Sequence, residues 1–328
     1  MSKNSIKVVI AGFHGALASA ITGIFDLLSL AGVTWNRIQQ QPIQRLFTVQ
    51  IASEDGHVIQ CINGLNLNAH LAYDEIDHVD VLVIPTIGAA IVPILEQHKA
   101  LITLIQRMDQ QNCMIAGNCT GSFFLAEAGI LAQRTATTHW GFEHEFRVRY
   151  PQVKLCPEQM ISRDGHIYTA GGGLAWFDLG LHFIERFYGF EIAIETAKAF
   201  VIDYQRNSQL SYALLRVAKP HQDQLIQRIQ MFLVEHLSDH ITLDELATRF
   251  NLTTRTLIRR FKAALDLPPN RYIQAMRMEA AQKRLEQTEQ SIEQIMHAVG
   301  YQDPSSFRRL FCKHTGLTPL AYRRRFSR

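Results

Sequence analysis

The sequence contains no cysteine pair at the spacing of a zinc or redox motif. Its five cysteines, an odd number, are scattered along 328 residues without a Cys-x-x-Cys pair or a Cys/His cluster. Disulfide frameworks and structural zinc sites use closely and regularly spaced ligands. One close histidine pair exists, His236 and His240, but no third ligand accompanies it. We therefore expect no metal site and a reduced, cytoplasmic setting.

The sequence also lacks an apolar run long enough to cross a membrane. The longest run, "VLVIPTIGAAIVPIL" at 81–95, is shorter than the roughly 20 residues that a spanning helix needs, and it contains Pro85 and Pro93. The N-terminus continues directly into "IKVVIAGF" without a charged and then apolar leader. We expect neither a signal peptide nor a membrane partner.

A phosphate-binding loop is missing as well. The stretch "TAGGGLAW" at 169–176 is rich in glycine, but it has neither the Lys and Ser/Thr of a P-loop nor the full GxGxxG spacing. We expect a strand-to-helix turn there, which could border a pocket, and no cofactor.

Charge is distributed unevenly over a length that suits two domains. Residues 221–328 contain 17 Lys and Arg against 11 Asp and Glu, a net charge of +6, whereas the remainder contains 16 against 19, a net charge of −3. A basic C-terminal third is expected if that part alone binds nucleic acid. Polar residues and Pro220 interrupt the periodicity between the parts, so we predict domains at 1–206 and 223–328 joined by a linker at 207–222.

The first part alternates short apolar runs with helical patterns. Such alternation predicts an α/β domain, a mostly parallel sheet with helices on both faces. The predicted strands are Lys7 to Phe13, Leu46 to Ser53, Val79 to Pro85 and Cys113 to Asn118, and helical patterns include Ala18 to Leu30 and Ile91 to Met108.

The second part reads as all helix and contains an internal repeat. Each repeat predicts a short helix, a tight turn and a second helix, and each first helix starts with a capping box, Thr242 with Glu245 and Ser291 with Gln294. Pairs at a constant offset of 50 are Leu257 and Phe307, Arg259 and Arg309, Phe261 and Phe311, Leu267 and Leu317, Pro269 and Pro319, and Tyr272 and Tyr322.

This arrangement is typical of a helix-turn-helix, whose second helix enters the major groove of DNA. The apolar positions of each second helix leave a polar and basic face outward. The alternative is a plain helical bundle with solvated arginines; the repetition and the basic balance favour DNA.

The last hundred residues resemble the DNA-binding domain of the AraC/XylS family of transcription regulators. "RMEAAQKRLEQT" at 277–288 is similar to the linker helix, and "VGYQDPSSFRRLFCKHTGLTPLAYR" at 299–323 to the family signature; Arg284 and Met296 depart from the usual leucine and alanine. The resemblance implies that the two recognition helices enter successive major grooves of double-stranded DNA at operator or promoter half-sites. It assigns base reading to Thr254, Arg255, Arg259, Ser306 and Arg309, and phosphate contact to Lys262, Arg308 and Lys313.

In the first part, "GNCTG" at 117–121 has the form of a nucleophile elbow between a strand and a helix. A helix that starts near Ser122 would direct its N-terminal amides at the Cys119 sulfur and stabilise a thiolate. A cysteine nucleophile also needs a base, for which His14 and His139 are candidates. The alternatives are a ligand-lining thiol and a buried, purely structural one.

Residues 6–204 resemble the PfpI-like, class I glutamine amidotransferase-like fold, which is flavodoxin-like. "GNCTGSFFLAEAGILAQRTATTHW" at 117–140 is similar to the GlxA-like subgroup that is fused to AraC-type domains. Thr120 stands where PfpI proteases carry histidine, and Ala20 where isonitrile hydratases carry an acid. The loop "PTIGAA" at 85–90 leaves Gly88 to donate its amide.

The resemblance thus implies a pocket without its chemistry, and not an enzyme. We predict a homodimeric transcription regulator that senses an unidentified small molecule bearing a carboxylate or amide. Alternatives are a cysteine-dependent amidase or hydratase, or a redox sensor, using Cys119. The predicted ligand-binding residues are His14, Gly88, Asn118, Cys119, Thr120 and His139.

Overall fold

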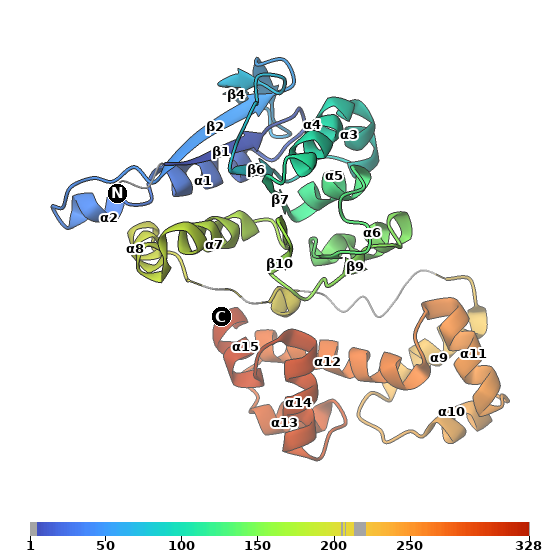
Figure 1. Cartoon of the computed structure of the whole chain (residues 1–328). Coiled ribbons are helices and arrows are strands. Elements are labelled where there is room, and N and C mark those ends of the chain that lie inside the picture. The colour runs from blue at the N-terminus through green and yellow to red at the C-terminus, as the bar shows by residue number, and fades with distance from the viewer. Residues whose placement is uncertain (1–4, 205, 207, 213–220, 328) are drawn as a thin grey trace. The chain divides into compact units, whose positions relative to one another are not determined.

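A computed structural model describes residues 5–204, 206, 208–212 and 221–327. The chain divides into two compact units, Met1–Gln209 and Leu210–Arg328, which we call the first and second units (Figure 1). Residues 207 and 213–220 of the predicted linker lie outside the described residues. No described helix has both the length and the apolar character needed to cross a membrane.

The first unit is built on a seven-stranded sheet with the order β10-β11-β7-β6-β1-β2-β5. All neighbouring strands are parallel except β10 and β11. The central strands are buried on both faces, as their apolar runs predict. The strands are β1 (Ile6–Ala11), β2 (Phe47–Ser53), β5 (Leu71–Ala72), β6 (Val81–Ile84), β7 (Met114–Asn118), β10 (Ile161–Asp164) and β11 (Ile167–Ala170); β3 (Val58–Gln60) pairs with β4 (Asn66–Asn68), and β8 (Thr135–Ala136) with β9 (Lys154–Leu155).

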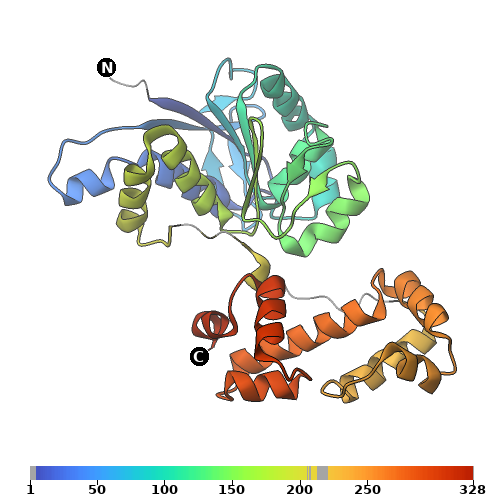
Figure 2. The same cartoon turned by 60° about the horizontal axis from the view of Figure 1, so that its bottom comes forward.

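Helices cover both faces of this sheet (Figures 1 and 2). One face carries α1 and α7, with α8 packed beside α7 and α2 beside α8; the other carries α3, α4, α5 and α6. The bounds are α1 (Ala18–Ser29), α2 (Thr34–Ile38), α3 (Ile91–Gln97), α4 (Lys99–Gln110), α5 (Ser122–Glu127), α6 (Glu143–Arg149), α7 (Ala175–Tyr188) and α8 (Phe190–Phe200), with 3-10 turns η1 (Cys119–Gly121), η2 (Trp140–Phe142) and η3 (Leu210–Tyr212).

The single helix expected from Ile91 to Met108 is wrong. The helix breaks at His98, whose backbone leaves the helical region with φ −108° and ψ 53°. The ring of His98 is buried, and its Nε2 lies 3.0 Å from the main-chain carbonyl of His14. An apolar periodicity that continues through both helices does not reveal this break.

The described part of the second unit consists of helices and their connections, and it has two hydrophobic cores. The N-terminal half of α12 contributes Tyr272 and Met276 to the first core, and its C-terminal half contributes Met278 and Leu285 to the second. The helices are α9 (Gln224–Glu235), α10 (Leu243–Arg249), α11 (Thr254–Leu265), α12 (Pro269–Gln287), α13 (Ile292–Ala298), α14 (Pro304–Thr315) and α15 (Pro319–Phe326).

Both predicted capping boxes are confirmed. Thr242 and Glu245 exchange side-chain and main-chain hydrogen bonds at the start of α10, and Ser291 and Gln294 do the same at the start of α13. Two of the free amides of each first helix are thereby satisfied in the same way.

Candidate functional site

The turn after β7 is a true elbow. Cys119 has a φ of 55°, in the left-handed region that non-glycine residues seldom adopt. A Cβ at Gly121 would lie 2.6 Å from the main-chain oxygens of Ile84 and Pro85, and one at Gly117 would lie 3.0 Å from the Ser122 backbone. The elbow therefore needs both glycines, as the "GNCTG" pattern predicts.

The expectation of a stabilised thiolate is wrong. Cys119 is 3% exposed, and burial raises the pKa of its thiol to about 11. The amide and hydroxyl of Thr120 and the hydroxyl of Thr86 act in the opposite direction but do not compensate. In the part of the chain that the structure describes, no imidazole and no carboxylate contributes to this shift. Desolvation is the largest effect on this pKa, and the helix that follows the elbow, α5, is only six residues long.

The polar side chains of the elbow bind the neighbouring loop. The Thr120 hydroxyl accepts from the Ile87 amide at 3.0 Å, and the Asn118 amide donates to the Thr86 hydroxyl at 2.8 Å. The Oδ1 atom of Asn118 is buried and has no hydrogen-bond partner among the described residues. Asn118 and Thr120 thus hold loop 85–90 against the elbow.

The remaining predicted ligand residues reach this edge of the sheet but are engaged elsewhere. The Gly88 amide donates to the Gly15 carbonyl at 2.9 Å, so its predicted role as a free donor is wrong. His14 is exposed and accepts from the Gln60 amide through Nδ1 at 3.0 Å. His139 likewise accepts the Gly141 amide at 3.0 Å. Both candidate bases thus use Nδ1 to accept a main-chain amide, and no hydrogen bond among the described residues joins either ring to Cys119.

Thr138 and Gln209 connect the elbow to the end of the first unit. The Thr138 hydroxyl donates to the Cys119 carbonyl at 3.1 Å. The buried side-chain amide of Gln209 donates to the carbonyls of Thr138 and Pro157, each at 2.7 Å. A Cβ at Gly171 would lie 2.7 Å from the Gln209 side chain, so the glycine-rich stretch at 169–176, a strand-to-helix turn as expected, gives Gln209 its space.

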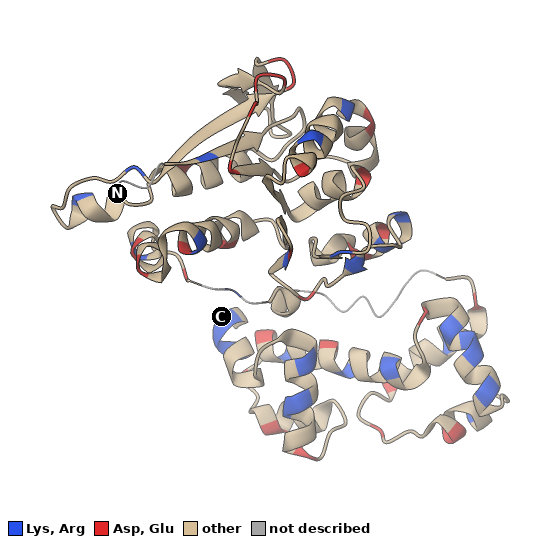
Figure 3. Ribbon diagram, viewed as in Figure 1, with Lys and Arg blue, Asp and Glu red and all other residues tan. Residues whose placement is uncertain are grey.

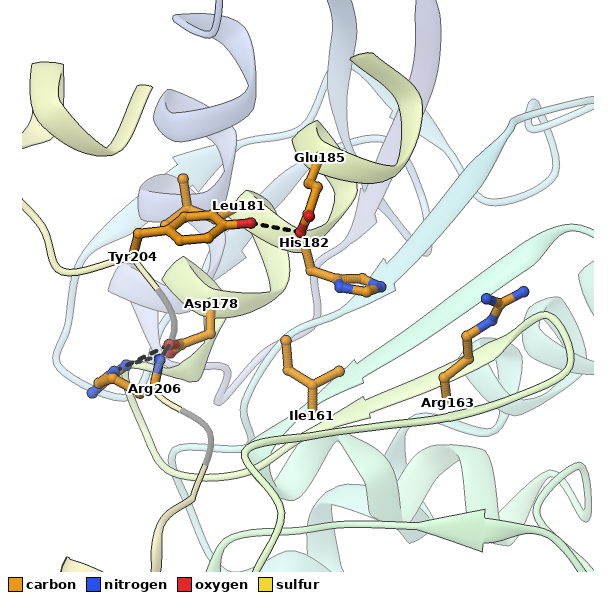
Figure 4. A pocket seen from close by; sticks show the side chains of 8 residues that line it. All are labelled: Ile161, Arg163, Asp178, Leu181, His182, Glu185, Tyr204 and Arg206. Atoms are coloured by element: carbon orange, nitrogen blue, oxygen red, sulfur yellow. Dashed lines mark hydrogen bonds and ion pairs between the residues drawn. The ribbon is translucent and has the colours of Figure 1, made fainter. Parts of the chain in front are cut away.

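A pocket of about 250 Å³ lies elsewhere in the first unit (Figure 4). It is lined by residues of β10 and α7 together with Tyr204 and Arg206, and none of the predicted ligand residues lines it. Sequence reasoning missed it because its lining comes from three segments that share no motif. The lining residues are Ile161, Arg163, Asp178, Leu181, His182, Glu185, Tyr204 and Arg206.

The second unit contains two helix-turn-helix pairs, α10–α11 and α13–α14. The turn residues Asn251 and Gly300 both have left-handed backbones, with φ of 53° and 81°. Asp266 and Gly316, which end the recognition helices, also match, with φ of 60° and 71°. The repeat seen in the sequence therefore extends to the backbone conformation of each turn and each C-cap.

Most of the predicted DNA-binding residues are exposed on α11 and α14, where Lys and Arg recur (Figure 3). Exposed are Arg255, Arg259, Lys262, Arg308, Arg309 and Lys313, while Thr254 and Ser306 are half-buried. The Thr254 hydroxyl donates to the Asp244 carboxylate of the preceding helix, and Arg309 lies 3.5 Å from the Ser306 hydroxyl. The exposed arginines and lysines are thus more available than Thr254 and Ser306.

One arginine of α11 is bound to the start of another helix, which the sequence did not indicate. Arg260 binds Asp223, the N-cap of α9, through Nη2–Oδ1 at 2.7 Å and Nε–Oδ2 at 2.9 Å. The equivalent position in the second repeat is Leu310. This pair holds α9 on the first recognition helix.

Comparisons with known proteins agree with both units. A helix-turn-helix domain matches residues 246–325, and the DJ-1/PfpI family matches residues 31–186. The HTH-type transcriptional regulator CdhR of Pseudomonas aeruginosa is 30% identical over 276 residues, which cover 84% of this chain and 81% of that protein. The chain belongs to the AraC-type transcription regulators that carry a DJ-1/PfpI domain.

A second regulator and a solved structure are also similar to this chain. The HTH-type transcriptional regulator GbdR of Pseudomonas aeruginosa is 27% identical over 302 residues, 90% of this chain and 80% of that protein. The crystal structure of Drosophila melanogaster DJ-1beta matches with a TM-score of 0.51 at 18% identity, over 61% of this chain and all of that one, which shows the fold of the first unit. The fold class and the DNA-binding regulator predicted from the sequence are confirmed.

Proposed function

We propose that this regulator reads two adjacent major grooves through α11 and α14 and that its first unit senses a small molecule without transforming it. The observation that carries the DNA part is the pair Arg259 and Arg309, which occupy equivalent, exposed positions of the two recognition helices. An arginine fork can donate to both major-groove acceptors of a guanine. The exposed Lys262, Arg308 and Lys313 are assigned to phosphates, which hold the register.

The proposal that the elbow is not catalytic rests on the properties of the Cys119 thiol. A nucleophilic cysteine needs an accessible thiolate and an adjacent base. Cys119 is buried, its pKa is raised, and both candidate histidines accept main-chain amides through Nδ1. These contacts disfavour the amidase or hydratase and the redox sensor, and they suit a first unit that transmits binding. We also propose a homodimer, because two copies would bind paired half-sites more tightly than one.

The DNA-binding test selects genomic fragments on the full-length protein at about 0.15 to 0.2 M salt, which suppresses nonspecific phosphate binding. We expect a shared motif with half-sites about one helical turn apart. Arg259→Ala and Arg309→Ala should each weaken binding to that motif about tenfold or more and relax the preference at one base pair.

The matched control is Arg228→Ala, which removes an exposed arginine from α9, outside both helix-turn-helix pairs. It should leave the motif and its preferences unchanged. If all three variants lost the same affinity for the motif, the effect of the arginines would be one of net charge. The assignment of the two recognition positions would then be refuted.

A further inference from the structure

The pocket lined by β10, α7, Tyr204 and Arg206 has the size of a small metabolite site. Its volume of about 250 Å³ is below the roughly 300 to 1,000 Å³ of drug-sized sites. In Figure 4 the Asp178–Arg206 pair lies on one side, and His182 and Arg163 lie on the other. The pocket is therefore lined by both acidic and basic groups.

The carboxylates of this pocket already have partners. Asp178 binds Arg206, with Nε–Oδ1 at 3.1 Å, and Glu185 accepts from the Tyr204 hydroxyl at 2.6 Å. These pairs attach Arg206 and Tyr204, respectively, to α7. The acidic groups are thus occupied in holding the wall of the pocket.

The donors on the other side are less satisfied. Among the described residues, Arg163 makes one hydrogen bond, from Nε to the Gly165 carbonyl at 3.1 Å, so its terminal nitrogens remain available. Nε2 of His182 is buried without a hydrogen-bond partner in the described chain. Both side chains pack against the buried ring of Tyr168, with the Arg163 guanidinium 5.6 Å and the His182 ring also 5.6 Å from its centroid.

The donors Arg163 and His182 are available, whereas the carboxylates of the pocket already accept hydrogen bonds. This combination favours an anionic ligand. A guanidinium binds a carboxylate with two parallel, charge-assisted hydrogen bonds, and a neutral imidazole can donate one more. Burial lowers the pKa of His182, which keeps the imidazole neutral and leaves Arg163 as the cation.

We propose that this pocket binds a small organic carboxylate, held by Arg163 and His182. The inference rests on the proposed sensing function and gives it a site distinct from the elbow. Tyr204 and Arg206 belong to the pocket wall and shortly precede Gln209, where the first unit ends. A bound carboxylate would therefore act directly on the segment that leads to the DNA-binding unit.

The test is calorimetric titration of the full-length protein with succinate and acetate, and with succinamide, acetamide and inorganic phosphate for comparison. We expect a carboxylate to bind and its uncharged amide not to bind. Arg163→Gln and His182→Gln should each weaken binding about tenfold or more, since each removes a donor to an anion. Arg37→Gln, an exposed arginine on α2, is the charge-matched control and should bind like the wild type.

The inference fails if neither carboxylate binds, if phosphate alone binds, or if the Arg163 and His182 variants bind as the wild type does. Thermal melting of each variant shows whether it is folded, and the exposed Arg163 is the variant least able to disturb the fold. DNA binding by the same preparations separates the two proposals. If the protein binds the DNA motif but no carboxylate, the proposed DNA-binding function stands and only the proposed carboxylate site is refuted.

Discussion

The side-chain amide of Gln209 donates to the main-chain carbonyl of Thr138 at 2.7 Å, and Thr138 donates from its hydroxyl to the carbonyl of Cys119. Two hydrogen bonds thus separate the elbow from the last residue of the first unit. The residue that follows, Leu210, begins the short turn η3, whose Tyr212 packs on Phe326 within the second unit. A change at the elbow accordingly has a short covalent and hydrogen-bonded route to the DNA-binding unit.

Gln209→Ala should destabilise the first unit. It leaves the buried carbonyls of Thr138 and Pro157 without a donor, which costs about 1 to 3 kcal/mol. The measurement is the free energy of unfolding by urea, with Gln152→Ala, an exposed glutamine, as control. A Gln209 variant as stable as the control would show that these bonds contribute nothing.

Cys119 should react slowly with iodoacetamide below about pH 9, because burial raises its thiol pKa to about 11 and covers the sulfur. Mass spectrometry after timed alkylation measures the rate, and the urea-unfolded chain is the reference. Equal rates for the folded and unfolded chain at pH 7 would restore the enzyme hypothesis.

Because the folded pKa of Cys119 is raised, its protonated thiol contributes stability that is complete below the unfolded value. That contribution is lost as pH rises from about 9 to about 11. Cys119→Ala should therefore reduce the alkaline loss of stability.

Substitution of the two turn residues of the helix-turn-helix pairs should change the free energy of unfolding by different amounts. Gly300→Ala places a Cβ 2.8 Å from the Arg277 guanidinium carbon and 2.9 Å from the Ser238 carbonyl, at a φ of 81°. The left-handed backbone alone costs about 1 to 2 kcal/mol. Asn251→Gly keeps a permitted backbone and should change the free energy of unfolding by less than about 0.5 kcal/mol. Comparable losses in both variants would contradict this account of the turns.

The Asp223–Arg260 pair should couple α9 to α11 in a pH-dependent way. The Arg260 guanidinium, followed by the amides of α9, lowers the pKa of Asp223. A lowered folded pKa gives stability that is present above the unfolded value, about 4, and is lost as pH falls through the lowered pKa. A double-mutant cycle of Asp223→Asn and Arg260→Gln should show coupling at pH 7 that decreases in acid. Coupling that is absent at pH 7, or that is unchanged in acid, would refute the ion pair.

The sequence predicted features whose signals are local or repeated. Buried strands such as 81–84 are continuous apolar runs, and the offset of 50 between Arg259 and Arg309 persists in the structure. What it could not predict depends on distant neighbours. The Gly88 amide is taken by Gly15, and the desolvation of Cys119 comes from packing that no motif records.

The pocket illustrates the same limit. His182 and Arg163 lie on different elements, and both contact the ring of Tyr168. Arg260 lies on a recognition helix, and its partner Asp223 is 37 residues away in the sequence. Charge pairs across elements therefore need the structure.

The length of helix α12 sets the distance and the rotation between the two recognition helices. It contributes to both cores of the second unit and has 19 residues, about 28 Å at 1.5 Å per residue. Each residue added to it would advance one helix-turn-helix pair by about 1.5 Å and rotate it by about 100° relative to the other. The spacing of the two DNA segments that a single chain can read is thus encoded in the length of one helix, and a relative with a longer or shorter α12 would require a differently spaced operator.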